Sequence, residues 1–483
     1  MTAPRGMKNL AIYVVVIVGF SAGIMAILDL GKRVEKARAA VPGAVSAATL
    51  GTPMESAGSS ARGRLVKNAQ TPLALLLLQV VVIVGTARVV GSVFVRFGQP
   101  QVVGEMLAGI LLGPSFFGLI APVTQAALFP ASSIEALSML SQIGVIVFMF
   151  VVGIDLDVAH LKQRSQAAIG VSHASIIVPF FLGTGVALFV YRELAPPGVA
   201  FDAFALFLGI AMSITAFPVL ARILDERGLT QSALGATALA CAAVDDLTAW
   251  CLLAVVVAIA KASAIAGALL TVVLSLVFVA LMLSIGMPLA AKLIRPQVSS
   301  EAHGKTMLAG VLAFVFLCAL TTEAIGIHAL FGAFLAGVVM PPYASVREHL
   351  RTRLESFSSV FLLPLFFAFT GLRTQIALLG DATGWLLCLG LIAVAIVGKV
   401  GGTMFAARVT GMTWPDSFAL GALMNTRGLV ELIVLDLGYN LGILSARIFA
   451  MMVLMALLTT CATGPLLDWY ERWRGPMKKE RAS

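Results

Sequence analysis

Long apolar runs follow one another along almost the whole chain, and this pattern restricts the fold more than any other feature. A helix needs ~20 apolar residues to cross the hydrocarbon core of a bilayer, so each run predicts one membrane crossing. The runs do not alternate apolar and polar residues, which argues against a transmembrane β-barrel. There are fourteen such runs, at residues 10–30, 73–95, 101–120, 134–154, 166–191, 202–224, 231–260, 264–291, 306–324, 326–342, 355–373, 383–408, 415–438 and 445–469.

Charged residues are scarce, at 12% of the 483 residues, while 59% are apolar. A soluble globular protein carries about 25% charged residues, and a charge at the bilayer centre costs roughly 3 kcal/mol. The composition therefore excludes an ordinary soluble enzyme and a disordered chain. It predicts an all-α polytopic membrane protein with 13–14 transmembrane helices, embedded in the lipid bilayer of the cell (plasma or inner) membrane.

The loops between the runs carry most Lys and Arg residues, and their distribution predicts the orientation. Loops on the side of the C-terminus, together with the short basic tail 470–483, hold 17 Lys and Arg residues, whereas the opposite loops after the second run hold 4. Cytoplasmic loops are enriched in Lys and Arg, so we expect the C-terminus in the cytoplasm. The basic residues form no continuous patch, which argues against a nucleic-acid partner despite the net charge of +9.

The N-terminal residues 1–71 differ in pattern from the rest of the chain. The run 10–30 is either an uncleaved transmembrane anchor or a signal peptide, because basic residues precede it and small residues follow it. Residues 31–71 are rich in Ala, Gly and Ser, which predicts a flexible basic linker. We therefore expect residues 1–71 to be dispensable for the activity of the membrane domain 72–469.

Two stretches of the chain repeat the same pattern of small residues. Gly104–Pro114 and Gly332–Pro342 share Gly, Leu, Ala, Gly and Pro at identical offsets, and the run after each contains Phe-x4-Gly. The partners lie seven crossings apart, so they cross the membrane in opposite directions. Internal similarity with inverted topology is typical of secondary transporters. It predicts two halves, about 72–260 and 306–469, joined by a linker helix at 264–294.

Two adjacent acidic residues, Asp245 and Asp246, lie near the centre of the run 231–260. An acid in the middle of a membrane span is costly and points to a functional site. Adjacent helical residues project about 100° apart, so one carboxylate can face a cavity while the other faces a neighbouring helix. Lys399, deep in the run 383–408, is a candidate partner because a buried lysine keeps its charge best beside an acid. A purely structural ion pair is the alternative.

The run 202–224 contains Ser213, Thr215 and Pro218 in its cytoplasmic half. Proline removes a helical hydrogen bond and hydroxyl groups compete for backbone groups, so we expect this helix to be broken. The ends of half-helices expose carbonyl and N–H groups that can coordinate ions. These three residues are therefore candidates for coordination by an unwound helix.

The run 415–438 contains a second candidate break, at Asn425, Arg427 and Gly428. Gly428 allows the helix to unwind, and Arg427 and Glu431 are neighbours one turn apart. The Arg427–Glu431 pair either stabilises the break or contacts the substrate directly, and the sequence does not separate these two roles.

These motifs resemble those of the monovalent cation:proton antiporter superfamily, and specifically its second family with the Kef-type and plant cation/H+ exchanger-like transporters. The resemblance covers residues 72–468 and implies a homodimer, in which each subunit has a scaffold and a mobile six-helix core with two crossed, unwound helices. The similar stretches are Gly104–Pro114, Ser213–Arg222, Ala242–Trp250, Lys399–Thr403 and Asn425–Leu435.

The resemblance also implies roles for individual residues. Asp246 would bind the transported cation and the proton, and Asp245 would form a salt bridge with Lys399. Oxygen atoms near Ser213 and Thr215 would complete the site, with no cofactor and no metal other than the transported ion. Kef-type relatives carry a nucleotide-binding domain after the last span, and the sequence shows no glycine-rich nucleotide motif there, so we do not expect ligand gating of that kind.

We expect a secondary active transporter rather than an enzyme, because the sequence shows no nucleophile–base pair and no metal cluster. It would exchange Na+ or K+ for protons by alternating access, since an acid that binds either a proton or a cation couples the two. Release of a second proton from Lys399 would make the exchange electrogenic. The alternatives are a sodium-coupled organic-solute symporter of related fold, or a potassium efflux system without its regulatory domain. The sequence does not distinguish Na+ from K+.

Overall fold

The computed structural model describes residues 18–30, 32, 71–155, 166–230, 232–261, 265–294, 301–341 and 343–474. Within these ranges every regular element is a helix, so the predicted all-α fold is confirmed. The expectations for most of the linker 31–71 and for the tail beyond residue 474 lie outside the described residues.

All of the predicted apolar runs are helical in their described parts, although some are broken into two helices. The protein is therefore a multi-pass membrane protein. Three of its apolar helices are short, at Val18–Leu30, Phe201–Ser213 and Ala329–Val338. Within the described ranges, ten helices are long and apolar enough to cross a membrane, at Pro72–Arg96, Gln101–Ile120, Ser132–Ile154, Ile169–Leu194, Ala233–Ala260, Val273–Lys292, Lys305–Ile325, Ser345–Leu379, Ala382–Val409 and Ala446–Trp473.

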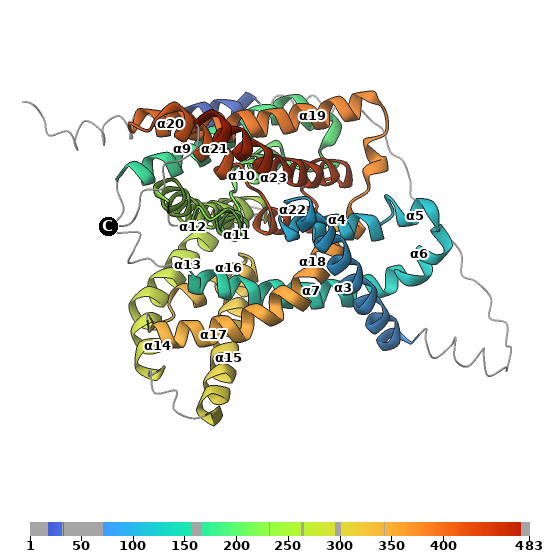
Figure 1. The fold of residues 1–483 in the computed structure, drawn as a ribbon, viewed down its shortest axis with the longest axis vertical. Coiled ribbons are helices and arrows are strands. Elements are labelled where there is room, and N and C mark those ends of the chain that lie inside the picture. The colour runs from blue at the N-terminus through green and yellow to red at the C-terminus, as the bar shows by residue number, and fades with distance from the viewer. Residues whose placement is uncertain are drawn as a thin grey trace, which may run out of the picture.

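One set of helices, here called the panel, combines helices from both predicted halves. Helix α16 packs against α7 and α15, whereas α18 packs against α4 and α7, and α3 covers α4. Most of the panel lies in the lower half of Figure 1. The panel consists of α3 (Pro72–Arg96), α4 (Gln101–Leu112), α7 (Ala131–Asp155), α15 (Glu301–Ile325), α16 (Ala329–Val338), α17 (Ala344–Phe357), the π-helix η2 (Ser358–Leu362) and α18 (Leu363–Arg373).

The second set of helices, here called the bundle, fills most of the upper half of Figure 1. Helix α9 packs against α10, α12 and α20, and α21 packs against α12, α20 and α23. The bundle consists of α9 (Gln166–Leu194), α10 (Phe201–Ser213), α11 (Phe217–Glu226), α12 (Ala233–Lys261), α19 (Ala382–Ile396), the π-helix η4 (Val397–Gly401), α20 (Gly402–Val409), α21 (Trp414–Met424), α22 (Leu429–Asn440) and α23 (Ala446–Arg474).

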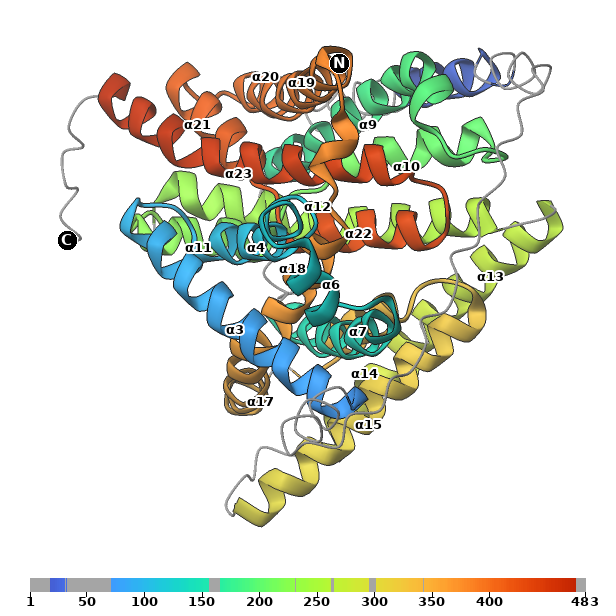
Figure 2. The same cartoon turned by 90° about the vertical axis from the view of Figure 1, so that its right-hand side faces the viewer.

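A long linking segment connects the end of α12 in the bundle to α15 in the panel. It contains α13 (Ile265–Leu281), the π-helix η1 (Met282–Gly286) and α14 (Met287–Leu293). Figure 2 shows α13 and α15 running obliquely along one edge of the molecule. The remaining short helices lie in connections, namely α5 (Phe117–Ile120), α6 (Pro122–Leu128) and the 3-10 helix η3 (Ile376–Leu379).

Two glycine–glycine crossings hold the panel together. A Cβ atom added to Gly371 of α18 would lie 2.0 Å from the carbonyl carbon of Gly109 in α4. A Cβ atom added to Gly337 of α16 would lie 2.8 Å from the Cα atom of Gly153 in α7. Glycine at these positions allows the helix backbones to touch. All four glycines belong to the repeated motifs, so equivalent residues of the two halves form two equivalent crossings.

The predicted helix breaks lie in the bundle. Helix α10 ends at Ser213 and α11 begins at Phe217, while α21 ends at Met424 and α22 begins at Leu429. The helix that carries Lys399 also departs from α-helical geometry there, because Lys399 is the central residue of η4. A π-helical turn inside an α-helix often marks a functional site.

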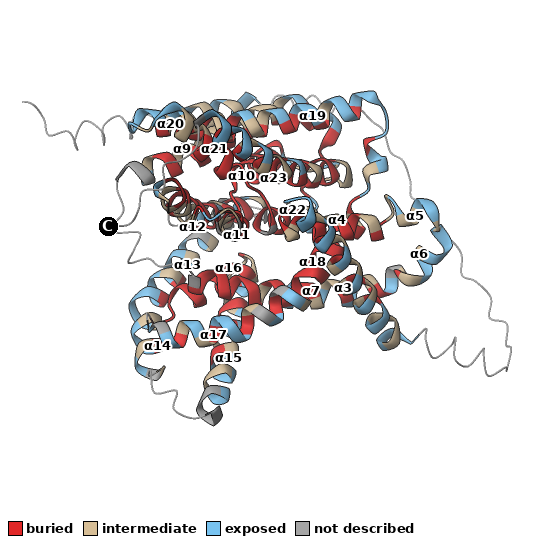
Figure 3. Cartoon of the chain, in the orientation of Figure 1, coloured by how far each residue is buried: buried red, intermediate tan, exposed pale blue. Residues whose placement is uncertain are grey.

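Buried residues gather where helices of one set face each other and where the two sets meet, whereas the outer surfaces carry exposed apolar side chains, as Figure 3 shows. On α13, for example, Leu274 and Val277 are 39% and 48% exposed. Exposed apolar surface of this extent is expected for helices that face lipid acyl chains.

The N-terminal helix Val18–Leu30 packs on the outer side of the bundle. The Phe20 ring meets the Phe181 ring of α9 edge-on at 5.2 Å between ring centroids. Gly23 lies against the same ring, and Lys32 forms an ion pair of 3.4 Å with Asp202 at the start of α10. The predicted anchor is therefore a helix docked on α9.

Candidate functional site

The two broken helices of the bundle cross each other at their unwound segments. The Ala216 N–H donates to the Thr426 carbonyl at 2.9 Å, and the Thr215 hydroxyl donates to the Met424 carbonyl at 3.0 Å. Each broken helix has two additional ends, and each end carries N–H or C=O groups without partners in its own helix. The crossing therefore gathers backbone dipoles at one place inside the membrane.

Two cations satisfy the free carbonyl groups at the end of α10. The Arg427 guanidinium donates to the Ala211 carbonyl at 2.9 Å and to the Met212 carbonyl at 2.7 Å. The Lys399 ammonium donates to the Ser213 carbonyl at 2.5 Å. Positive charge at the C-terminus of a helix interacts favourably with the helix dipole. Both cations thus stabilise the end of this half-helix.

Asp245 and Lys399 form the predicted ion pair. The Lys399 Nζ atom lies 3.0 Å from Asp245 Oδ2, and both side chains are fully buried. The hydroxyl groups of Ser172, Ser175 and Thr215 also donate to this carboxylate, at 2.5, 2.8 and 2.8 Å. A buried ion pair is stabilised only when further hydrogen bonds satisfy the remaining lone pairs of the carboxylate. Asp245 is therefore fully paired within the bundle.

Ser172 and Ser175 are site residues that the sequence analysis missed. They lie about one turn apart on α9, so both hydroxyl groups can reach the same carboxylate. A Ser-x-x-Ser pair in an otherwise apolar span is a weak signal, because serine is common at contacts between membrane helices. The sequence alone gave no reason to connect the pair to Asp245.

Asp246 has a different environment from its neighbour. Its side chain is 1% exposed, yet neither carboxylate oxygen accepts a hydrogen bond of normal geometry from the described residues. The backbone N–H of Phe217, at the start of α11, lies near enough to interact with its charge. Pro218 follows in the first turn of α11, so the predicted proline lies where the second half-helix begins.

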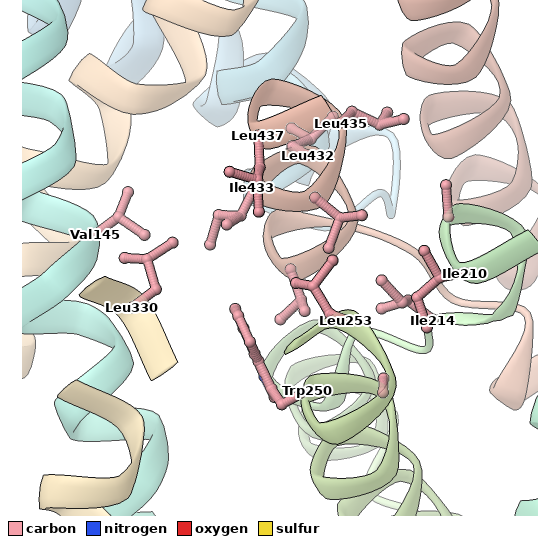
Figure 4. Close-up of a cluster of buried hydrophobic side chains, with 14 of the residues drawn as sticks. Val145, Ile210, Ile214, Trp250, Leu253, Leu330, Leu432, Ile433, Leu435 and Leu437 are labelled. Carbon is pink, nitrogen blue, oxygen red and sulfur yellow. The ribbon is translucent and has the colours of Figure 1, made fainter. Parts of the chain in front are cut away.

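Asp246 lies on the side of α12 that meets the panel. Trp250 and Leu253 follow it at spacings of four and seven residues, which places them on the same helix face. The Trp250 ring stacks on Phe334 of α16, with 6.2 Å between ring centroids. Figure 4 shows Trp250 and Leu253 on the bundle side and Leu330 on the panel side of this cluster. Asp245 therefore faces the interior of the bundle, whereas Asp246 faces its boundary with the panel.

The candidate residues of the second break are all buried at the crossing. The Asn425 side chain has neither its donor nor its acceptor paired within the described ranges. Arg427 lies 3.4 Å from Glu431, and the Thr460 hydroxyl bridges the Arg427 backbone N–H and carbonyl at 2.9 and 2.7 Å. These contacts favour a structural role for Arg427, because its guanidinium and its backbone are both held in place.

Ser213 contributes to the site through its carbonyl oxygen. Its hydroxyl donates to the Gly209 carbonyl of its own helix at 2.7 Å, whereas its carbonyl accepts from Lys399. Thr215, by contrast, presents its hydroxyl to Asp245. The structure therefore brings together all the predicted site residues. Ser213 contributes its backbone carbonyl oxygen, whereas Thr215 contributes its side-chain hydroxyl.

Buried charges at the crossing do not balance. Three acids face two cations, so the fully ionised site carries a formal charge of −1; the groups are Asp245, Asp246, Glu431, Lys399 and Arg427. An uncompensated buried charge is strongly unfavourable. Binding of one proton or one monovalent cation neutralises this excess. The oxygen atoms of Asp246 and Glu431 accept no hydrogen bond from the described residues, but Glu431 has Arg427 as an ion-pair partner at 3.4 Å, whereas Asp246 has no ion-pair partner among these residues.

Comparison with known proteins shows the family of the chain. The profile of a family described as "Sodium/hydrogen exchanger, transmembrane" matches residues 80–473. The chain belongs to this sodium/hydrogen exchanger family. It is a family of transporters, and the predicted membership of the cation:proton antiporter superfamily is confirmed.

Relatives within the exchanger family differ in length. The chain is 43% identical over 396 residues to the Na(+)/H(+) antiporter NhaS4 of Synechocystis, covering 82% of this chain and 97% of that protein. It is 38% identical over 396 residues to Cation/H(+) antiporter 18 of Arabidopsis thaliana, covering 82% of this chain but 49% of that protein. The plant relative is thus about twice as long as the region that it shares with this chain.

A solved structure of another exchanger has a similar fold. The sodium proton antiporter MjNhaP1 of Methanocaldococcus jannaschii, determined at pH 8, matches with a TM-score of 0.60 and covers 83% of this chain and 97% of that chain. Its sequence identity is 12%, so this likeness supports the fold and not the details of the site.

Proposed function

We propose that this exchanger-family protein transports a monovalent cation, Na+ or K+, in exchange for protons, with Asp246 as the group that binds either ion. The observation that carries the proposal is the contrast between the two adjacent acids. Asp245 accepts four hydrogen bonds or ion-pair contacts, whereas Asp246 has none of normal geometry. A buried carboxylate with unused oxygens needs a ligand, and the family transports cations and protons.

Competition at Asp246 couples the two ions. The ionised carboxylate attracts a cation, and its protonation removes the charge that holds the cation. The unpaired amide of Asn425 and the backbone oxygens of the unwound segments supply further ligands of the kind that alkali cations prefer. Because Asp246 faces the boundary between the panel and the bundle, a relative movement of the two sets would expose it to each side of the membrane in turn.

We propose that the protein exchanges two protons for one cation. The three N–H groups of the Lys399 ammonium donate to Asp245 and to the carbonyls of Ser175 and Ser213. The ammonium form is therefore fully satisfied while Asp245 remains in place. A cation that draws Asp245 away would leave Lys399 buried without its counter-ion, and a lysine in that position releases its proton more readily. The second proton would make the exchange electrogenic.

The proposal includes the membrane and the assembly of the protein. We place it in the cell (plasma or inner) membrane with its C-terminus in the cytoplasm, on the basis of the 17 to 4 distribution of Lys and Arg between the two sides. A homodimer is proposed from the family resemblance.

Proton flux in proteoliposomes tests the proposed function. Purified protein is reconstituted, and a pH-sensitive dye reports flux while Na+, K+ and Li+ are titrated at several pH values. We expect saturable flux with Na+ or K+ in the wild type and none above background with Asp246→Asn. Glu355→Gln, an exposed acid of α17 that pairs with Arg351, serves as the control and should transport normally.

Two results would contradict the proposal. Normal cation-dependent flux in Asp246→Asn would exclude Asp246 as the binding group. Flux that requires Na+ together with an organic solute, and that carries no protons outward, would favour a sodium-coupled symporter. An imposed membrane potential then tests the stoichiometry, because only an electrogenic exchange changes its rate with voltage.

A further inference from the structure

Arg373 forms a contact that joins the panel to the bundle. It is the last residue of α18 in the panel, and its Nη1 atom lies 2.7 Å from Asp436 Oδ1 and 2.6 Å from Asn440 Oδ1. Asp436 and Asn440 are one turn apart near the end of α22 in the bundle. The Asn440 amide also donates to Asp436 Oδ2 at 2.9 Å, so the two acceptors are held together.

Aromatic rings hold the Arg373 guanidinium from both sets of helices. Its central carbon lies 4.1 Å from the centroid of the Phe369 ring in α18 and 5.3 Å from that of the Tyr439 ring in α22. A guanidinium over an aromatic face gains about 1 kcal/mol when partly shielded from water. The Arg373 and Asp436 side chains are 23% and 10% exposed. The contact is therefore built from several groups and is shielded from water.

Other ion pairs found among the described residues do not join the panel to the bundle. Arg447 and Glu193 join α23 to α9, and Arg227 and Asp468 join the segment after α11 to α23, so both pairs lie within the bundle. Arg351 and Glu355 are neighbours on α17 in the panel. The Arg373–Asp436 pair differs from these because it crosses the boundary.

Arg373 and Asp246 both lie at the boundary between the panel and the bundle. Near the same end of the molecule, Arg447 at the start of α23 contacts the Leu379 carbonyl just beyond α18. Apolar residues of the two sets also form one buried cluster. Figure 4 shows Trp250, Leu253 and Ile433 of the bundle opposite Val145 and Leu330 of the panel. The ion pair and this apolar cluster thus both join the panel to the bundle.

We propose that Arg373, with Asp436 and Asn440 as its partners, is the latch that closes this end of the boundary between panel and bundle, and that the latch opens once in each transport cycle. The inference rests on the proposed function, since it assigns a step of the exchange to a residue outside the ion-binding site. Arg373 is a positioning residue, because it acts on the relative placement of two helix sets and does not touch the transported ion.

A reversible cross-link tests whether the latch must open. A disulfide needs Cα atoms within about 7 Å, and the long arginine side chain separates the backbones further, so Arg373→Cys and Asp436→Cys are joined by a cleavable bifunctional methanethiosulfonate. The five native cysteines are first replaced by alanine, at Cys241, Cys251, Cys318, Cys388 and Cys461. Wild-type protein and this background must both show cation-dependent proton flux, and absence of flux in the wild type refutes the proposed function rather than the latch.

Cross-linking across the boundary should stop exchange. We expect flux to fall at least about tenfold, equivalent to ~1.4 kcal/mol, and to recover after reduction. The matched control joins Arg447→Cys to Glu193→Cys within the bundle, and its cross-link should leave flux unchanged. Normal flux through the protein cross-linked at residues 373 and 436 would overturn the inference, as would equal inhibition by both cross-links.

Thiol labelling tests the latch without any transport. Leu253→Cys is placed in the cysteine-free background, and a membrane-impermeant maleimide is added from the Arg373 side. Breaking the latch with Arg373→Gln should raise the labelling rate about fivefold or more, because the closed state loses ~1 kcal/mol of stability relative to the open state. Arg447→Gln should not change it. Equal rates with and without Arg373→Gln, or the same rise with Arg447→Gln, would contradict a latch at this position.

Discussion

The panel and the bundle solve the problem of packing membrane helices in opposite ways. The panel brings unbroken helix backbones into contact at glycine–glycine crossings, whereas the bundle breaks two of its helices and fills the crossing with charged groups. Among the described residues that are buried, the panel holds one charged side chain, Glu105; the bundle holds Asp245, Asp246, Lys399, Arg427, Glu431 and Asp436.

The difference shows how one chain combines rigidity with a charged site. Close backbone contact leaves the panel little freedom, because interiors packed this tightly do not deform continuously. The bundle stabilises Asp245 and Lys399 with side chains and helix ends of the same set, whereas Asp436 pairs with the panel and Asp246 has no side-chain partner among the described residues. The relative movement that we propose would therefore carry the whole site with the bundle.

The largest expected effect comes from unpairing a charge inside the bundle. Asp245→Asn leaves Lys399 buried beside a neutral partner, which should destabilise the folded protein by about 3–5 kcal/mol. The double variant Asp245→Asn with Lys399→Gln removes both charges and should recover part of this loss. Thermal unfolding in detergent measures both variants. A double variant no more stable than Asp245→Asn alone would show that the ion pair does not account for the loss.

A substitution at a backbone contact of the panel should destabilise the folded protein almost as much. Gly371→Ala places a Cβ atom 2.0 Å from the backbone of Gly109, which should destabilise the panel by about 3 kcal/mol or more. Gly390 of α19 has no atom within 4 Å of an added Cβ atom, so Gly390→Ala should be neutral or slightly stabilising. Folded yield and the unfolding temperature distinguish the two. Equal behaviour of both variants would remove the basis for calling the panel rigid.

A smaller effect is expected from the hydroxyl groups that hold Asp245. Ser172→Ala removes one donor to a buried carboxylate, which should lower stability by about 1.5–3 kcal/mol and slow exchange severalfold without abolishing it. The control is Ser275→Ala in α13, where the hydroxyl donates to the Thr271 carbonyl of its own helix. Unfolding temperature and proton flux are measured together. Wild-type values for Ser172→Ala would mean that the remaining donors suffice for Asp245.

The smallest effect concerns the N-terminal helix. A protein that begins near Thr71 should still exchange ions, because the contacts described for the helix Val18–Leu30 and for Lys32 are with α9 and α10 and not with the site residues. It should lose about 1 kcal/mol of stability with the contact between Phe20 and Phe181. Truncated protein that inserts and unfolds normally, yet cannot exchange ions, would make this helix a functional part of the bundle.

Much of the site was predictable because charge in a membrane span is rare. Asp245, Asp246 and Lys399 stand out in apolar runs for this reason, and Gly428 and Pro218 mark the two breaks without any knowledge of the fold. The repeat of small residues likewise marked the four glycines that form the two crossings of the panel. The prediction did not extend to Ser172 and Ser175, since serine in a membrane helix is too common to indicate a site.

The sequence by itself determined which segments cross the membrane, where two of them break, and which charged groups lie at mid-membrane. The tertiary structure decided which helices are neighbours, which acid is paired, and that Arg373 meets Asp436 across the boundary. The physical reason is that a membrane helix is apolar on the faces that meet lipid and on most faces that meet protein. Its sequence therefore carries little information about which neighbour each face contacts. Only packing assigns each face to a partner.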